Sequence, residues 1–157
     1  MIFVTVGTNE ARFDRLLLAV AQLELDEDVV VQHGHSSPLH PPGATLVDFL
    51  PFEGIVEMVR RSRVVVTHAG VGSVMVSLAN GKRPIVVPRR KAFSEAVDDH
   101  QLELGRRFAS AGLVTFVEEP DAIAEAMLGE QGAASVVPQT SPLALDLRGF
   151  LEEVVAA

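Results

Sequence analysis

The sequence predicts an α/β fold in which helices cover both faces of a parallel sheet. Short β-branched runs alternate with segments whose apolar residues recur at helical spacing. Glycine-bearing loops follow several of these runs, and no repeat, linker or low-complexity tract divides the chain. With 157 residues, 48% of them hydrophobic and 22% charged, the composition is that of a globular protein. We therefore expect one domain over residues 1–157.

The expected elements follow from these patterns in chain order. Strands are expected at residues 2–6, 29–32, 45–49, 64–66, between 82 and 88, and at 113–117. Helices are expected at residues 13–23, 52–61, 73–81, 102–111 and 121–128. Residues 129–139 are weakly patterned and are expected to form a loop. A last helix is expected from the apolar stripe of Leu143, Leu147, Phe150, Leu151, Val154 and Val155. This stripe packs either on the domain's own core or against a partner.

Composition also excludes several classes of protein. The formal net charge of −8 argues against a nucleic-acid binder, which needs a broad basic face. The absence of cysteine excludes disulfides and thiolate chemistry and agrees with a reducing compartment. The first residues lack the basic flank of a signal peptide, and no apolar run reaches the roughly 18 residues of a membrane span. We therefore expect a cytoplasmic protein.

The turn from His68 to Ser73 is the sequence's best candidate for a phosphate site. It reads His-Ala-Gly-Val-Gly-Ser and follows a strand that is expected to be buried. Ser73 is expected to cap the next helix, which Gly81 ends, and a helix N-terminus offers free N–H groups to an anion. The pattern is neither Gly-x-Gly-x-x-Gly nor a P-loop, so a dinucleotide site and an ATPase are not supported. The alternative is a tight connection without a ligand.

Other polar loops are expected at the same edge, because ligands of such folds bind outside the carboxyl ends of the strands. These loops carry Gly7-Thr8-Asn9, Gln32-His33-Gly34-His35 and the segment from Pro88 to Gln101. In the last of them, Arg89-Arg90-Lys91 can bind a diphosphate or form a solvated cluster. Asp98 and Asp99 suit the start of a helix, whereas His100 and Gln101 can also bind hydroxyl groups.

Metal and hydrolase sites are not expected. The spacing of His33, His35 and His40 matches no standard zinc pattern. Ser73 does not lie in a Gly-x-Ser-x-Gly elbow. Glu103 and the Glu118-Glu119 pair are expected to be solvated surface charges.

Taken together, several motifs resemble the C-terminal half of GT-B glycosyltransferases of family 28, a Rossmann-like domain. The motifs are His68-Ala-Gly-Val-Gly-Ser73, Gly81-Lys-Arg-Pro-Ile-Val-Val-Pro88-Arg89 and Asp99-His-Gln101. The opening Phe3-Val-Thr-Val-Gly7-Thr8 and the short chain resemble the small catalytic subunits of two-component UDP-sugar transferases. Eukaryotic subunits of this kind act in dolichol-linked oligosaccharide synthesis, and bacterial ones in exopolysaccharide synthesis. The resemblance covers roughly residues 1–117.

The resemblance implies an inverting transferase with a UDP-sugar as donor substrate, no other cofactor and no metal. It implies a lipid-linked saccharide acceptor and a membrane-anchored second subunit, which would recruit the chain to the inner face of the membrane. The donor-binding residues that it implies are Gly7, Thr8, Gly34, His68, Ala69, Gly70, Gly72, Ser73, Arg89, Asp99, His100 and Gln101. The last three of these would face the sugar.

The sequence departs from the family pattern at one position. Many members carry a Glu that binds the ribose in the helix after the glycine turn, and Val76 stands there in this chain. Either Ser77 replaces the Glu or the affinity for UDP is weaker. No catalytic base is identified: His35 and Glu10 are candidates, and the partner is the alternative source. A non-catalytic nucleotide-sugar-binding or regulatory module is the second reading, and a Rossmann-like oxidoreductase is disfavoured because its fingerprint is absent.

Overall fold

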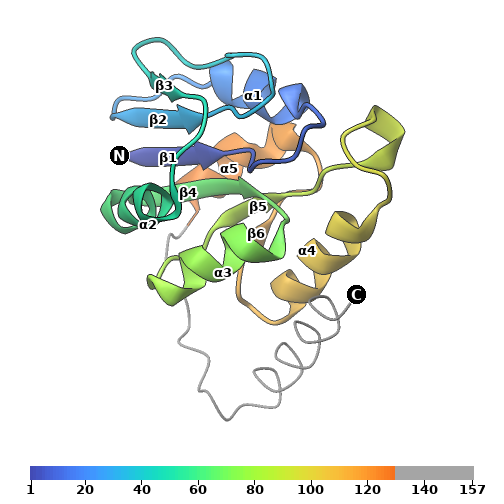
Figure 1. Cartoon of the computed structure of the whole chain (residues 1–157). Helices are drawn as coiled ribbons and strands as arrows, with labels where there is room; N and C mark the ends of the chain where they lie inside the picture. The colour runs from blue at the N-terminus through green and yellow to red at the C-terminus, as the bar shows by residue number, and fades with distance from the viewer. Residues whose placement is uncertain (130–157) are drawn as a thin grey trace.

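A computed structural model describes residues 1–129, which form a six-stranded parallel sheet with helices on both faces (Figure 1). The strand order is β3-β2-β1-β4-β5-β6, and all five pairings are parallel. The predicted α/β class is confirmed. The predicted C-terminal helix and the predicted loop beyond Gly129 lie outside the described residues.

The elements follow the predicted alternation. The strands are β1 (Ile2–Thr5), β2 (Val29–Gln32), β3 (Thr45–Val47), β4 (Val64–His68), β5 (Ile85–Val87) and β6 (Thr115–Phe116). The α-helices are α1 (Asp14–Ala21), α2 (Phe52–Arg61), α3 (Val71–Ala79), α4 (His100–Ser110) and α5 (Ile123–Leu128). Two 3-10 turns, η1 (Lys91–Phe93) and η2 (Pro120–Ala122), lie in the connections.

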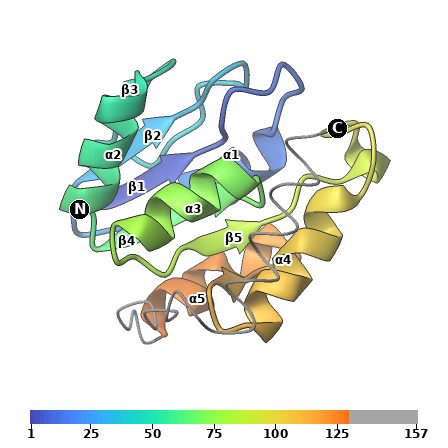
Figure 2. The same ribbon diagram turned by 60° about the horizontal axis from the view of Figure 1, so that its bottom comes forward.

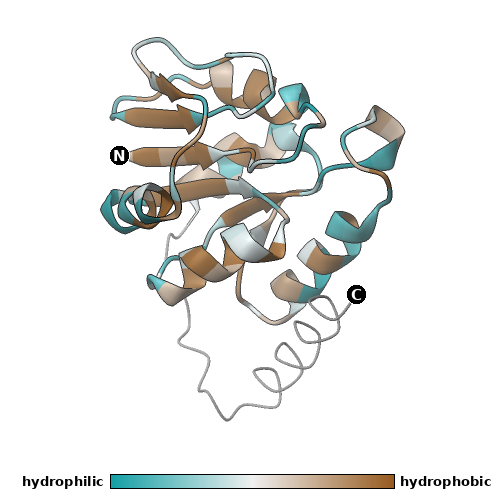
Figure 3. Ribbon diagram, in the orientation of Figure 1, coloured by the Kyte–Doolittle hydropathy of each residue, from teal (hydrophilic) through white to brown (hydrophobic). Residues whose placement is uncertain are grey.

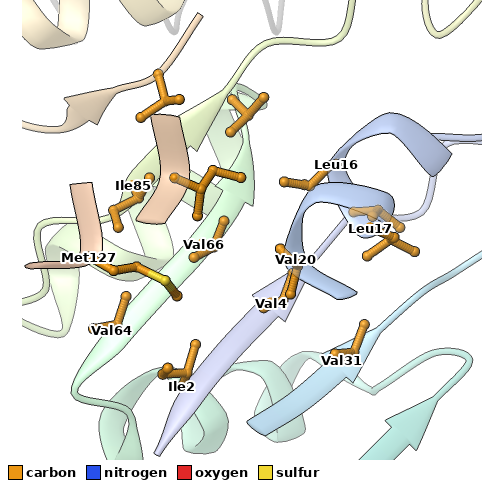
Figure 4. Packing of buried hydrophobic residues seen from close by; sticks show 14 of the residues in the cluster. Ile2, Val4, Leu16, Leu17, Val20, Val31, Val64, Val66, Ile85 and Met127 are labelled. Atoms are coloured by element: carbon orange, nitrogen blue, oxygen red, sulfur yellow. The ribbon is translucent and has the colours of Figure 1, made fainter. Parts of the chain in front are cut away.

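Alternate residues of each central strand pack into the apolar layers on the two faces of the sheet, because successive side chains of a strand point to opposite faces. Ile2 and Val4 pack with residues of α1 and α5 (Figure 4). Phe3 packs instead with Val59 of α2 and with Val65 of β4. Figure 2 shows α2, α3 and α4 lying over this second face. The strands are apolar along their length, whereas the helices carry polar residues on their outer sides (Figure 3). This pattern is expected of a sheet covered on both faces.

The direction in which successive strands are added to the sheet changes beside β1. It runs outward from β1 through β2 to β3, and β4 then pairs with the other side of β1, with Thr5 opposite Thr67. The connections that leave β1 and β4 therefore diverge to opposite sides of the sheet and leave space between them. Open α/β sheets bind ligands at such a switch point.

The ends of several elements differ from the predictions. Helix α3 begins at Val71 with Gly70 in the N-cap position, so Ser73 lies inside the first turn and does not cap it. The helix expected from residue 121 begins at Ile123, because Asp121 lies in η2. The strand expected at 113–117 is reduced to Thr115–Phe116, and Leu113 and Val114 are buried in the turn after α4. Gly81 and Gly112 follow α3 and α4 with positive φ, as predicted for helix ends.

Candidate functional site

A cleft of about 510 Å³ lies at the carboxyl ends of β1 and β4. Residues from five segments line it, and they are of two kinds, polar and apolar. The polar lining includes Thr5, Thr8, Asn9, Gln32, Ser73 and Gln101. The apolar lining consists of Leu50, Phe52, Ile55 and Val76. A volume of this size suits a small organic ligand that needs both kinds of contact.

The loop after β1 reaches the cleft because Gly7 adopts a left-handed backbone. Its φ is +76°, and a Cβ at this position would overlap the ring of His68. The N–H of Gly7 donates to the Thr5 hydroxyl at 3.1 Å, and this hydroxyl donates to the Gln32 amide oxygen. Only glycine combines this conformation with so close an approach to the ring.

The start of α3 presents backbone N–H groups to the cleft. The first intrahelical bond of the turn runs from the Val74 N–H to the Gly70 carbonyl, at 3.1 Å. Among the described residues, no side chain caps this helix end. A Cβ built at Gly72 would meet no described atom within 4 Å. The N–H groups of the first turn therefore face open space at the positive end of a helix, which is a suitable environment for an anion.

His68 lies between the two glycine loops and is partly buried. Its Nε2 is 3.1 Å from the Ser73 hydroxyl, and its Nδ1 is 3.4 Å from the Gln101 amide nitrogen. Burial, followed by the positive charge of Arg89, lowers the pKa of His68 to about 4. The imidazole is therefore neutral at pH 7. A Cβ at Gly70 would overlap the same ring, so the histidine explains the need for a second glycine.

Arg89 does not occupy the position implied for it. Its side chain is 0% exposed, and its guanidinium donates to the carbonyls of Val6, Ala11 and Glu95. It also stacks on the Phe13 ring, 4.9 Å from the centroid. The guanidinium therefore holds the β1 loop and the β5–α4 loop together and does not reach the cleft. The interpretation of Arg89 as a diphosphate contact is wrong for this structure.

The segment Asp99-His100-Gln101 does not form one face toward the cleft. Only Gln101 lines the cleft. The Asp99 carboxylate accepts the N–H of Lys91, and the His100 side chain is exposed. The Asp98 carboxylate accepts the N–H of His100 at 3.0 Å, which agrees with the predicted role of this segment at a helix start.

The remaining candidate residues either serve the fold or lie outside the cleft. Gly34 has a φ of +54°, and a Cβ there would lie 2.9 Å from the Gly7 carbonyl, so it lets the two loops approach. Ala69 is fully buried. His35 packs edge-on against Phe49, and Glu10 is exposed; neither lines the cleft.

Val76 lines the cleft, so the departure from the family pattern falls inside the site. Ser77 does not replace the missing carboxylate. It is 1% exposed, and its hydroxyl donates to the Ser73 carbonyl within the same helix. Ser77 therefore faces away from any ligand in the cleft.

Two features in or beside the site were not predicted from the sequence. The first is the Thr5–Gln32 pair, whose only signal is a polar residue at the end of each of two apolar strands. The second is Glu95, a 3%-exposed carboxylate that Arg15 binds with two nitrogens at 3.0 Å each. Glutamate side chains are mostly exposed, so the residue type of Glu95 did not indicate that it is buried. Arg90, by contrast, forms ion pairs with Glu118 and Glu119 at the surface.

The described part of the chain contains no group of three or more His, Asp or Glu side chains that could hold a metal ion. His33 contacts the Asp48 carboxylate and the Ser36 carbonyl, and His40 contacts the Pro41 carbonyl. Over residues 1–129, no helix has the length and apolarity needed to cross a membrane.

Comparisons with solved structures agree with the fold. CalG4, the calicheamicin glycosyltransferase, superposes with a TM-score of 0.64 at 23% identity, covering 86% of this chain and 34% of that chain. MurG from Acinetobacter baumannii gives 0.55 at 18% identity, covering 80% and 41%. At these identities the likeness supports the fold alone.

Sequence comparisons identify the family. Human UDP-N-acetylglucosamine transferase subunit ALG13 is 29% identical over 123 aligned positions, which cover 71% of this chain and 10% of that protein. The mouse protein of the same name is 27% identical over 165 aligned positions, which cover 95% of this chain and 14% of its own length. The chain thus spans a small part of the curated relatives it matches. The model of the glycosyltransferase family 28 C-terminal domain matches residues 1–137. Because this match covers most of the sequence, the chain belongs to the glycosyltransferase family 28 C-terminal domain family.

Proposed function

We propose that the cleft binds a UDP-sugar and that the chain is the catalytic, donor-binding subunit of an inverting glycosyltransferase. The observation that carries this proposal is the uncapped start of α3, which faces the cleft beside Gly72. A diphosphate matches this environment in charge and in its demand for N–H donors. Membership of glycosyltransferase family 28 supports the same reading.

The polarity of the cleft suggests how the donor lies. The diphosphate sits at the start of α3, between Gly7 and Gly72. The uracil lies against the apolar residues Leu50, Phe52 and Ile55. The sugar lies beside the polar residues Thr8 and Gln101. The transferred sugar in this proposal is a hexose or an N-acetylhexosamine.

The chain's part in the reaction is to stabilise the leaving group. An acceptor hydroxyl attacks the anomeric carbon from the face opposite UDP, the bond to the phosphate oxygen breaks, and the anomeric configuration inverts. Negative charge grows on the diphosphate, where the N–H groups of α3 and the neutral side chains of His68 and Ser73 surround it. Preorganised dipoles of this kind lower a barrier without bound metal.

The acceptor and its base belong to a partner in this proposal. We propose a lipid-linked saccharide as acceptor and a membrane-anchored second subunit that holds it and recruits this chain to the membrane surface. One observation supports a partner: the relatives that the chain matches are named as transferase subunits. The candidate bases His35 and Glu10 lie outside the cleft, which favours a base from the partner.

A non-catalytic nucleotide-sugar-binding module is the second candidate. Val76 favours it, because an apolar side chain lies in the cleft where many family members bind the ribose through a carboxylate. Transfer assays separate the two candidates. Sugar transfer by the chain together with its partner, but by neither alone, supports the catalytic subunit. Nucleotide binding without transfer under any pairing supports the module.

The binding proposal is tested by calorimetric titration with UDP, UDP-glucose, UDP-N-acetylglucosamine and NAD. Heat with the UDP compounds and none with NAD is expected. Absence of heat with every UDP compound contradicts the proposal, whereas heat with NAD alone restores the oxidoreductase reading.

The position of the diphosphate is tested with Gly72→Val. The added side chain enters space that is open in the unliganded protein, so the variant should fold but lose UDP affinity by about 100-fold or more. Ala79→Val is the control, because it also introduces a valine, at the exposed far end of α3. Equal UDP affinity in the two folded variants would place the phosphate elsewhere.

A further inference from the structure

Three contacts connect the β5–α4 loop to the start of α3. The backbone N–H of Arg89 donates to Oε1 of Gln101 at 3.1 Å. Nε2 of Gln101 lies 3.4 Å from Nδ1 of His68. Nε2 of His68 lies 3.1 Å from the Ser73 hydroxyl, which lines the cleft. These groups form one continuous row from a buried loop to the candidate phosphate site.

The first group of this row, the backbone N–H of Arg89, determines which atom donates and which accepts at each of the following contacts. A backbone N–H can only donate, so the Gln101 atom facing Arg89 is the amide oxygen. The Gln101 atom facing His68 is then the NH2 group, which is also only a donor. Nδ1 of His68 must therefore accept, and the ring proton must reside on Nε2.

We infer that Gln101 is a positioning residue that holds His68 as the Nε2–H tautomer and thereby turns the proton of the Ser73 hydroxyl into the cleft. The Ser73 oxygen accepts the bond from His68, so its own proton is available to a ligand. The inference deepens the proposed function and rests on it for the nature of the ligand, a phosphate oxygen of a nucleoside diphosphate. An acceptor-only ligand of this kind needs the serine as a donor.

The row also disfavours the protonated ring. An imidazolium would place an N–H at Nδ1 against the NH2 group of Gln101, so two donors would face each other. The lowered pKa of His68, caused by burial and then by Arg89, acts in the same direction. His68 therefore contributes a fixed hydrogen bond and no charge.

Arg89 supplies the fixed end of the row. Its guanidinium is tied to the carbonyls of Val6, Ala11 and Glu95, which holds its backbone N–H in place. The buried arginine thus acts on the cleft through Gln101, without contact to the ligand.

Nitrogen-15 NMR of the His68 ring, without nucleotide, tests the tautomer. The wild-type protein is expected to show a neutral Nε2–H ring between pH 5.5 and 8, with the signal assigned by its loss in His68→Gln. Gln101→Glu replaces the donor with an acceptor and is expected to move the proton to Nδ1. A wild-type Nδ1–H ring, a charged ring at pH 6, or an unchanged tautomer in Gln101→Glu would overturn the inference.

A double-mutant cycle tests the effect on the ligand. Gln101→Leu is expected to weaken UDP binding about tenfold in the wild-type background, which corresponds to the loss of one charge-assisted hydrogen bond. In a Ser73→Ala background it should weaken binding less than about twofold, because the hydroxyl is already gone. Equal losses in both backgrounds, or no loss in either, contradict this relay from Gln101 through His68 to Ser73.

The two tests separate this inference from the proposed function. If the wild-type chain binds no UDP compound, the proposed function fails, and the ring tautomer still decides the relay. If UDP binds and the ring is the Nδ1–H form, the relay fails and the proposed function stands.

Discussion

The turn from His68 to Ser73 and the loop from Pro88 to Gln101 both follow buried strands, and both carry residues that look suited to bind a phosphate. In the turn, His68, Gly72 and Ser73 all line the cleft. In the loop, the Arg89 guanidinium is buried under carbonyls, and Gln101 alone lines the cleft.

The difference comes from the length of each connection. Two residues join β4 to α3, so once the strand and helix form, the positions of the turn residues are nearly fixed. Twelve residues join β5 to α4, and their direction depends on what the rest of the fold offers them. The β1 loop offers two free carbonyls and the Phe13 ring, and Arg89 fills that place.

The largest effect is expected from removing the buried arginine of the loop. Arg89→Met leaves several buried carbonyls without their donor and should lower the free energy of unfolding by roughly 3–5 kcal/mol. Arg90→Met is the control, because its partners Glu118 and Glu119 are at the surface, and it should cost less than about 1 kcal/mol. Urea unfolding of both variants measures this. Similar costs would mean that the two arginines have equivalent roles.

A smaller effect should separate two glycines of the turn. Gly70→Ala places a Cβ against the His68 ring and should cost roughly 2–3 kcal/mol as the ring is displaced. Gly72→Ala meets no described atom and lies in a helix, so stability should be equal or up to about 1 kcal/mol higher. Thermal or urea unfolding compares the pair. Equal stabilities would show that His68 does not limit the space at Gly70.

The smallest effect is a pH dependence that His68 contributes. Its folded pKa of about 4 lies below the ordinary histidine pKa of 6.5, so the unfolded chain binds the proton more readily between these values. Stability should therefore fall as the pH is lowered from about 6.5 to 4, and the contribution of His68 should be constant below pH 4. Urea unfolding across this range, compared with His68→Gln, isolates the contribution. Parallel curves for the two proteins would show that His68 titrates normally when folded.

The sequence predicted local structure well wherever the chemistry is local. The β-branched runs placed the central strands, and the apolar spacing from Phe13 and Phe52 placed α1 and α2. The glycine turn lies at a cleft, and its role as a phosphate site stays a prediction. The predicted cap at Ser73 was wrong, because the hydroxyl of Ser73 contacts the His68 ring instead of the helix N–H groups.

The sequence by itself determined the alternation of strands and helices, the glycines at the turns and the family to which the chain belongs. The elements and turns depend on residues close together in the chain, and the family follows from motifs that can be recognised in the sequence without the fold. Only the tertiary structure decided that β4 pairs with β1, which brings Gly7 beside His68 and opens the cleft. It also decided that Arg89 is buried while Gln101, twelve residues later, reaches the site. The physical reason is that burial and hydrogen-bond partners come from distant segments, and the residue type of an arginine or a glutamine does not specify which segments those are.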